Sequence, residues 1–99
     1  MYKRQNDNLR VVDGLWNDPR GCYVLNENTL NGKKVWDYLS DIEYEEGFPV
    51  TFRIYHDGVK WKMVDYNWYN TVYAISSTNS DIPTGGWSNS YVVTQGCGE

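Results

Sequence analysis

Residues 49–65 contain two runs of alternating apolar and polar side chains around Asp57-Gly58, and this stretch constrains the fold most strongly. An Asp-Gly dipeptide favours the two-residue turn of a tight β-hairpin. Such a turn would pair His56 with Val59 and fix the register of both strands. Side chains alternate between the two faces of a strand, so each face would have one chemical character. The expected apolar face consists of Phe52, Ile54, Trp61 and Met63. The expected polar face consists of Arg53, Tyr55, Lys60 and Lys62.

Short segments rich in β-branched and aromatic residues recur along the rest of the chain, separated by Gly, Asn, Asp and Pro. Besides the hairpin, the predicted strands are 9–12, 22–25, 33–38, 71–75 and 90–94. Residues 26–32 are expected to form a turn and residues 76–86 a loop. No segment has the 3.6-residue apolar period of a helix. The sequence therefore predicts an all-β fold, a single small antiparallel sheet, roll or sandwich of about six to seven short strands with a central Asp57-Gly58 hairpin.

A chain of 99 residues is expected to form one domain. We expect a β-rich module over residues 9–95, with tails at 1–8 and 96–99. The first five residues, MYKRQ, resemble the translation of a transposon-based sequencing adapter of the kind found in metagenomic fragments. That resemblance predicts that residues 1–5 are not native and that the gene continues upstream. A genuine polar tail is the alternative. No signal peptide is visible, and the compartment stays open.

The composition favours neutral or weakly polar partners. The chain has five Trp and nine Tyr but only two Phe, and rings that carry a polar group serve both cores and soluble binding faces. A formal net charge of −4 argues against nucleic acid and against anionic membranes as partners. No apolar run approaches the ~20 residues that cross a bilayer. We expect a glycan or protein partner, no nucleic acid, no membrane and no cofactor.

The sequence carries no catalytic motif, and we predict that the protein is not an enzyme and has no catalytic residues. The single histidine, His56, lies beside the predicted turn. Neither cysteine and no serine lies in a nucleophile motif, and no phosphate-binding loop or HExxH pattern occurs. Paired carboxylates can hydrolyse glycosides, but here the acidic residues cluster in loops of a small domain.

The acidic segment 40–48 is expected to be a solvated loop or a short helical turn. A calcium site is one alternative, although the spacing of an EF-hand is absent and we predict no metal site. Another alternative is that these acids lie over the polar face of the hairpin and offset its positive charge.

Cys22 and Cys97 are the only cysteines. They permit one disulfide that ties the second predicted strand to the C-terminal end, and such a bond would imply an oxidising compartment. Two ordinary thiols are the alternative.

Several short motifs occur in a fixed order along the chain. They are Gly21-x-Tyr23, Asn31-Gly32-Lys33-x-Val35-Trp36, Ile54-Tyr55, Trp61-Lys62-Met63-x-Asp65, Tyr73, Pro83 and Trp87. This order resembles a small β-rich module, GxY…NGKxV(Y/W)…W…P…W, that often occurs in tandem in multidomain proteins of algae and other protists. The resemblance covers residues 9–95 and implies a non-catalytic surface or interaction module without a well-established ligand. The chain departs from the pattern at Trp36, where Tyr is usual, and in the acidic insert.

The predicted loop 66–70 contains three aromatic and two amide side chains. Sugar-binding modules stack flat rings on the apolar faces of pyranoses, with amide groups beside them to bond hydroxyls. The predicted ligand-binding residues are Tyr66, Asn67, Trp68, Tyr69 and Trp87. In the alternative, the two tryptophans close the ends of the core. We therefore predict a non-catalytic binding module for carbohydrate. The alternative function is a protein-interaction or structural repeat unit of a larger multidomain protein, because open sheet edges accept further strands.

Overall fold

A computed structural model describes residues 7–16, 19–38, 43–45, 48–49, 51–66 and 69–97. The strands of this part of the chain are β1 (Leu9–Asp13), β2 (Gly21–Leu30), β3 (Lys33–Tyr38), β4 (Glu43–Glu45), β5 (Phe48–Pro49), β6 (Phe52–His56), β7 (Trp61–Asp65), β8 (Thr71–Ser76) and β9 (Val92–Gln95). Seven of them form one antiparallel sheet in the order β8-β7-β6-β3-β2-β1-β9, and β4 and β5 form a separate pair. The predicted all-β fold is confirmed.

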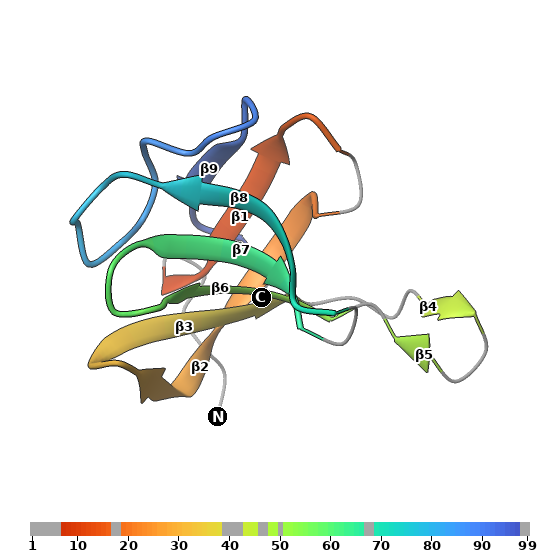
Figure 1. The fold of residues 1–99 in the computed structure, drawn as a ribbon, viewed down its shortest axis with the longest axis horizontal. Helices are drawn as coiled ribbons and strands as arrows, with labels where there is room; N and C mark the ends of the chain where they lie inside the picture. The colour runs from red at the N-terminus through yellow and green to blue at the C-terminus, as the bar shows by residue number, and fades with distance from the viewer. Residues whose placement is uncertain are drawn as a thin grey trace.

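The seven-stranded sheet curls into a half-barrel (Figure 1). From β1 to β8, each strand of this sheet pairs with the next strand of the sheet along the chain, so β3 pairs with β6. Strand β9 returns to pair with β1. The segment before β9 bonds to the other edge of the sheet, because Ser77 N donates to Gly86 O and Ser88 N donates to Ile75 O. The chain from residue 86 to β9 therefore spans from the β8 edge to β1. An edge that bonds to its own chain is less available to pair with other molecules.

Strand β2 continues five residues beyond the predicted end, into a segment that we expected to be a turn. The register between β2 and β3 shifts between Leu25 and Thr29, so a bulge lies there. Asn28 N donates to the side-chain oxygen of Asn26 within this bulge, which lets turn-forming residues remain in an extended strand. The turn itself is only Asn31-Gly32, with φ of 54° and 76°.

Two other boundaries differ from the prediction. Strand β9 begins at Val92 rather than at residue 90, because Asn89 and Ser90 have φ of 57° and 62°, which a strand does not permit. Glu43 pairs with Pro49, so part of the segment expected as a loop or helical turn is extended. A two-stranded pair has only edge strands, which tolerate proline and charged residues that a central strand does not.

The core lies on the concave face of the curled sheet and consists mainly of aromatic and aliphatic side chains. Its buried members are Leu9, Val11, Tyr23, Trp36, Phe52, Ile54, Trp61, Met63, Ala74, Tyr91 and Val93. The polar atoms of the buried rings have partners: Trp36 Nε1 donates to Asp7 O, Trp61 Nε1 to Ser80 O and Tyr23 Oη to Pro19 O. Buried indole and phenol groups without such partners would destabilise the fold.

The register of the central hairpin differs from the prediction by two residues. His56 pairs with Trp61, not with Val59. A shift by two residues leaves every side chain on the same face, because the side-chain period of a strand is two. The predicted apolar face is therefore confirmed, and its four residues, Phe52, Ile54, Trp61 and Met63, are all buried.

The difference arises at the tip of the hairpin. Asp57 N donates to Lys60 O, so Gly58 and Val59 form the tip. Only Gly58 has positive φ, at 100°. The carboxylate of Asp57 accepts hydrogen bonds from the backbone N–H groups of Val59 and Lys60, both at 2.8 Å. This Asx-type bonding stabilises a turn one residue later than the predicted one.

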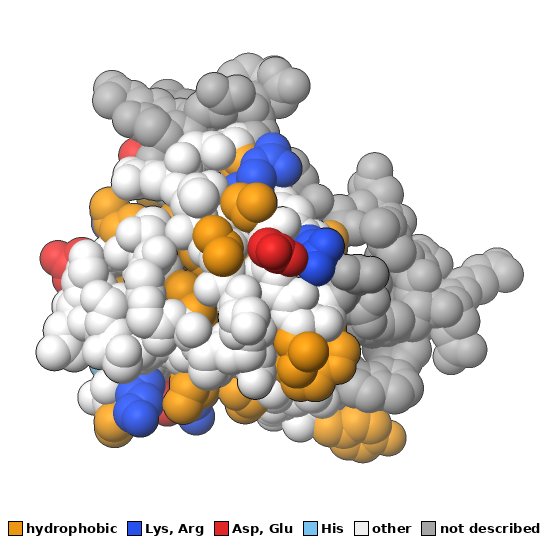
Figure 2. Space-filling model, turned by 90° about the horizontal axis from the view of Figure 1, so that it is seen from above, with side chains coloured by type: hydrophobic (Ala, Val, Ile, Leu, Met, Phe, Trp, Pro, Cys, Tyr) orange, Lys and Arg blue, Asp and Glu red, His pale blue; other side chains and the backbone are white. Residues whose placement is uncertain are grey.

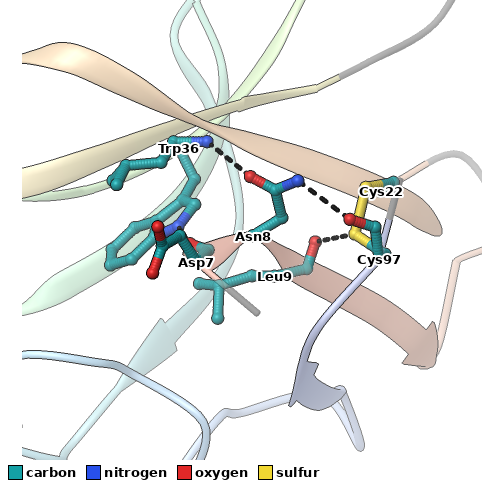
Figure 3. The surroundings of a disulfide bond; sticks show 7 residues. Asp7, Asn8, Leu9, Cys22, Trp36 and Cys97 are labelled. Carbon is teal, nitrogen blue, oxygen red and sulfur yellow. Dashed lines mark hydrogen bonds between the residues drawn. A yellow bond between two sulfur atoms is a disulfide. The ribbon is translucent and has the colours of Figure 1, made fainter. Parts of the chain in front are cut away.

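A disulfide between Cys22 and Cys97 joins β2 to the chain after β9 (Figure 3). The buried side chain of Asn8 lies beside it, donating to Cys97 O at 2.8 Å and accepting from Leu25 N at 3.1 Å. Cys97 Sγ also contacts Leu9 O at 3.1 Å, which is not a hydrogen bond because a disulfide sulfur carries no hydrogen. The folded unit therefore includes Asn8 and Cys97, beyond the expected bounds of 9–95.

Trp61→Ala is expected to lower the free energy of unfolding by ~3–5 kcal/mol, since it removes a fully buried ring from the core. Val59→Ala is the matched control, because Val59 is 74% exposed at the tip of the same hairpin. Its expected effect is within about 0.5 kcal/mol. Urea unfolding followed by circular dichroism measures both values, and equal unfolding midpoints for Trp61→Ala and the parent would contradict the register.

Reducing the disulfide, or replacing both cysteines by Ser, is expected to lower the free energy of unfolding by roughly 2–5 kcal/mol. The bond closes a loop between residues 75 positions apart, so the unfolded chain loses much of its freedom when the bond is present. Thiol titration of the denatured, unreduced protein should find no free thiol, whereas two free thiols would contradict the structure.

Candidate functional site

Two of the predicted ligand-binding residues, Tyr66 and Tyr69, lie in the connection between β7 and β8. The side chain of Tyr69 is 88% exposed and that of Tyr66 is 40% exposed. Tyr69 and Asn70 both have left-handed backbones, with φ of 58° and 49°. This conformation is unfavourable for an aromatic residue, and here no burial of the ring compensates for it. The other two predicted residues of this loop, Asn67 and Trp68, lie outside the described residues.

Trp87, the remaining predicted binding residue, is part of the fold. It pairs with Ser76 at the end of β8, and its ring packs against the hydrophobic core. Its Nε1 donates to Pro83 O at 2.8 Å. These contacts match the alternative in which this tryptophan closes the core. Trp87 therefore has a structural role that the exposed loop tyrosines do not share.

A polar group occupies the convex face of the sheet, opposite the core. Arg53 on β6 and Asp37 on β3 are directly paired in the register. Arg53 Nε donates to Asp37 Oδ1 at 2.6 Å, and Asn26 Nδ2 donates to Asp37 Oδ2 at 2.5 Å. Both carboxylate oxygens of Asp37 therefore have a partner, and three neighbouring strands contribute to one hydrogen-bonded group.

Tyr66 joins this polar group to the loop. The guanidinium carbon of Arg53 lies over the Tyr66 ring, 4.6 Å from its centroid. A cation over the face of an aromatic ring is attracted to it, and the stack fixes the plane of the guanidinium. The exposed side of the Tyr66 loop and the Arg53 pair therefore belong to one surface.

A hollow of about 130 Å³ lies beside Arg53 on the same face. It is lined by Asn26, Asn28, Thr29, Leu30, Val35 and Arg53. Val35 forms its apolar floor; this residue is only 3% exposed although it does not belong to the main core. The bulge in β2 places Asn28 and Thr29 at its rim. We refer to this hollow, together with Tyr66, as the outer-face site.

The sequence analysis placed Arg53 on a polar face but did not identify the hollow. The available signal was the local sequence Asn26-Glu27-Asn28, which we assigned to a turn. A bulge inside a strand brings such residues over the neighbouring strand, and its position depends on pairing with β3. The pairing was therefore needed to recognise the site.

Two positive side chains of the hairpin, Arg53 and Lys62, have partners among the described residues. Asp37 pairs with Arg53, and Asp57 pairs with Lys62 at 2.9 Å. Hydrogen bonds from the Lys60 backbone, and then from the Lys62 side chain, lower the pKa of the Asp57 carboxyl. The bond to Asp57 in turn raises the pKa of Lys62. The acidic side chains of residues 40–48, and with them the calcium alternative, lie outside the described side chains.

Within the described ranges, no three His, Cys, Asp or Glu side chains are grouped so as to bind a metal ion. The same part of the chain contains no helix long and apolar enough to cross a membrane. No protein-family model, curated protein or solved structure matches the chain. The proposals below therefore depend on the geometry of the outer-face site.

The Asp57→Asn variant is expected to lose less stability than the parent when the pH is lowered. The folded chain holds the Asp57 pKa below the value of about 3.9 that an unfolded chain has, so between those values the unfolded state binds more protons. The carboxylate thus stabilises the protein above about pH 4, and this contribution is lost as the pH falls through the folded pKa. The asparagine variant keeps the turn acceptor but not the charge.

Urea unfolding of parent and variant at about pH 7 and about pH 2.5 measures this difference. Glu27→Gln controls for the loss of one negative charge, since Glu27 is exposed on β2. If Asp57→Asn and the parent lose the same stability between the two conditions, the assigned role of Asp57 is wrong.

Proposed function

We propose that this protein is a non-catalytic carbohydrate-binding module whose ligand lies over Tyr66 and Tyr69. The observation that carries the proposal is the Tyr69 ring, exposed to solvent on a backbone in the unfavourable left-handed conformation. Backbone held in a sparsely populated conformation is characteristic of functional positions. The interior already contains two tryptophans, two tyrosines and a phenylalanine, so the core does not need these loop rings.

The chemistry of this surface suits a sugar. A pyranose has apolar C–H faces and hydroxyl groups around its edge, so it needs flat rings together with hydrogen-bonding side chains. Tyr66 and Tyr69 supply the rings. The amide of Asn28 and the hydroxyl of Thr29 supply groups that donate and accept. Figure 2 gives a different view of the surface, with the molecule seen from above, and there the apolar side chains occur in small separate groups, without the continuous patch of a stable protein interface.

A second candidate function is a protein-interaction unit, and a different group of residues favours it. Val12 on β1, Val92 on β9 and Leu15 after β1 are exposed aliphatic side chains without a role in sugar stacking. Val12 and Val92 belong to paired strands. This group lies on strands at the opposite end of the sheet order from β7 and β8, so a protein partner there would not depend on the loop tyrosines.

Tyr66→Ala and Tyr69→Ala are each expected to weaken glycan binding about tenfold, the equivalent of ~1.4 kcal/mol for one lost stacking contact. Affinity electrophoresis against a panel of soluble neutral and acidic polysaccharides identifies ligands by retardation. Titration of intrinsic fluorescence then gives dissociation constants for the parent and the variants.

Val59→Ala is the control, because it removes an exposed apolar side chain at the opposite end of β7. Thermal unfolding of each variant excludes loss of structure as the cause. Retardation by no polysaccharide in the panel, or equal binding by the parent and both tyrosine variants, would overturn the proposal.

A further inference from the structure

The geometry points to an acidic sugar as the ligand of the outer-face site, with the two terminal amino groups of Arg53 binding the carboxylate of a uronic acid. This inference rests on the proposed carbohydrate-binding function and specifies its ligand class. It follows from how Arg53 is held, from what its free edge faces and from the lining of the hollow beside it.

Arg53 is held at one nitrogen only. Arginine and carboxylate frequently form two parallel hydrogen bonds, but here only one bond joins Arg53 to Asp37, and Asp37 Oδ2 accepts from Asn26 Nδ2. Asp37 Oδ1 is left for Arg53, and it accepts from Nε. Among the residues that the structure describes, none accepts a hydrogen bond from either terminal nitrogen of Arg53. Within the described residues, the edge of the guanidinium that matches a planar carboxylate has no partner.

The orientation of this edge is fixed before any ligand binds. The hydrogen bond from Nε to Asp37 fixes one side of the guanidinium. The Tyr66 ring packs against one face of it, with 4.6 Å between the guanidinium carbon and the ring centroid. Arg53 also lines the hollow. A guanidinium that is already oriented loses little side-chain entropy when it binds a carboxylate. Asp37, Asn26 and the face of the Tyr66 ring under the guanidinium thus position Arg53, and Arg53 is the contact residue for the carboxylate.

The rest of the hollow fits one sugar unit. Exposed Leu30 offers apolar surface for part of a C–H face, and Asn28 and Thr29 line the hollow with groups that can bond hydroxyls. At about 130 Å³ the hollow is smaller than the roughly 300 Å³ at which pockets for drug-sized ligands begin. A single uronic acid residue of a longer chain therefore occupies it, and neighbouring sugars extend toward Tyr66 and Tyr69.

Geometry rather than net charge provides the selectivity. Asp37 neutralises Arg53, and the whole chain has a formal net charge of −4, so a polyanion is not attracted over long range. A sulfated polymer would present charge without a planar carboxylate. We therefore expect preference for uronic acids over neutral sugars and over sulfate esters, with weak dependence on salt.

The test compares polygalacturonate and alginate with the same polymers after carboxyl reduction, which converts each uronic acid to its neutral sugar. Dextran sulfate serves as the charged polymer without carboxylates. We expect at least one uronic acid polymer to bind about tenfold more tightly than its reduced form and than dextran sulfate. Arg53→Lys keeps the positive charge but lacks the planar pair of donors, and it should lose this preference, as should Arg53→Gln.

Lys60→Gln is the control for charge, because Lys60 is an exposed lysine at the tip of the β6–β7 hairpin and does not line the hollow. Asn28→Ala changes an exposed side chain at the rim and should weaken binding severalfold without affecting the fold. This second variant keeps the inference testable if the Arg53 variants unfold, which circular dichroism and thermal unfolding reveal.

Three results would overturn the inference. If the protein bound the uronic acid polymers and their carboxyl-reduced forms equally, it would have no selectivity for acidic sugars. The proposed function would still stand, provided that the tyrosine variants bind more weakly than the parent protein. If dextran sulfate bound as tightly as the uronic acid polymers, and Arg53→Lys did not weaken that binding, the attraction would depend on charge alone. Binding of no polysaccharide at all would remove both the inference and the proposed function.

Discussion

The contact between Trp36 and Trp61 inside the curled sheet is the constraint on which the rest of the structure depends. These rings come from β3 and β7, the two strands that flank β6, and their centroids lie 5.8 Å apart. The described part of the chain has no helix to cover the apolar face of the sheet. The sheet must therefore curl until side chains of its own strands cover one another. Two large indole rings fill that space where smaller side chains would leave voids.

Curling creates a second requirement, because a half-barrel leaves two edges that must be held in place. The return of β9 to β1 and the bonds between residues 86–88 and β8 meet this requirement at one side. Asn8 and the disulfide hold the beginning and the end of the described fold together, where Gly96 N also donates to Asn8 O. The polar groups of Asn8 are thus used in structure, and they are not available for a ligand.

The sequence was sufficient to predict which side chains of the hairpin face the core, because that assignment depends only on the alternation of strands. The sequence was insufficient to predict the position of the turn. The Asp57 carboxylate accepts hydrogen bonds from two backbone N–H groups, and the tip lies one residue later than predicted. The exposed loop tyrosines were also foreseeable from composition. The hollow was not, because it depends on the bulge in β2 and on the pairing of Asp37 with Arg53 across two strands.

The same alternation that fills the core determines what remains for function. Trp36 and Ile54 point inward, so their neighbours Asp37 and Arg53 must point outward and face each other across the β3–β6 pair. Asn26 then occupies the second oxygen of Asp37, and Arg53 keeps an unoccupied edge within the described structure. The recognition chemistry of the convex face thus follows from the register that buries the tryptophans, and a register shift by one residue would abolish both together.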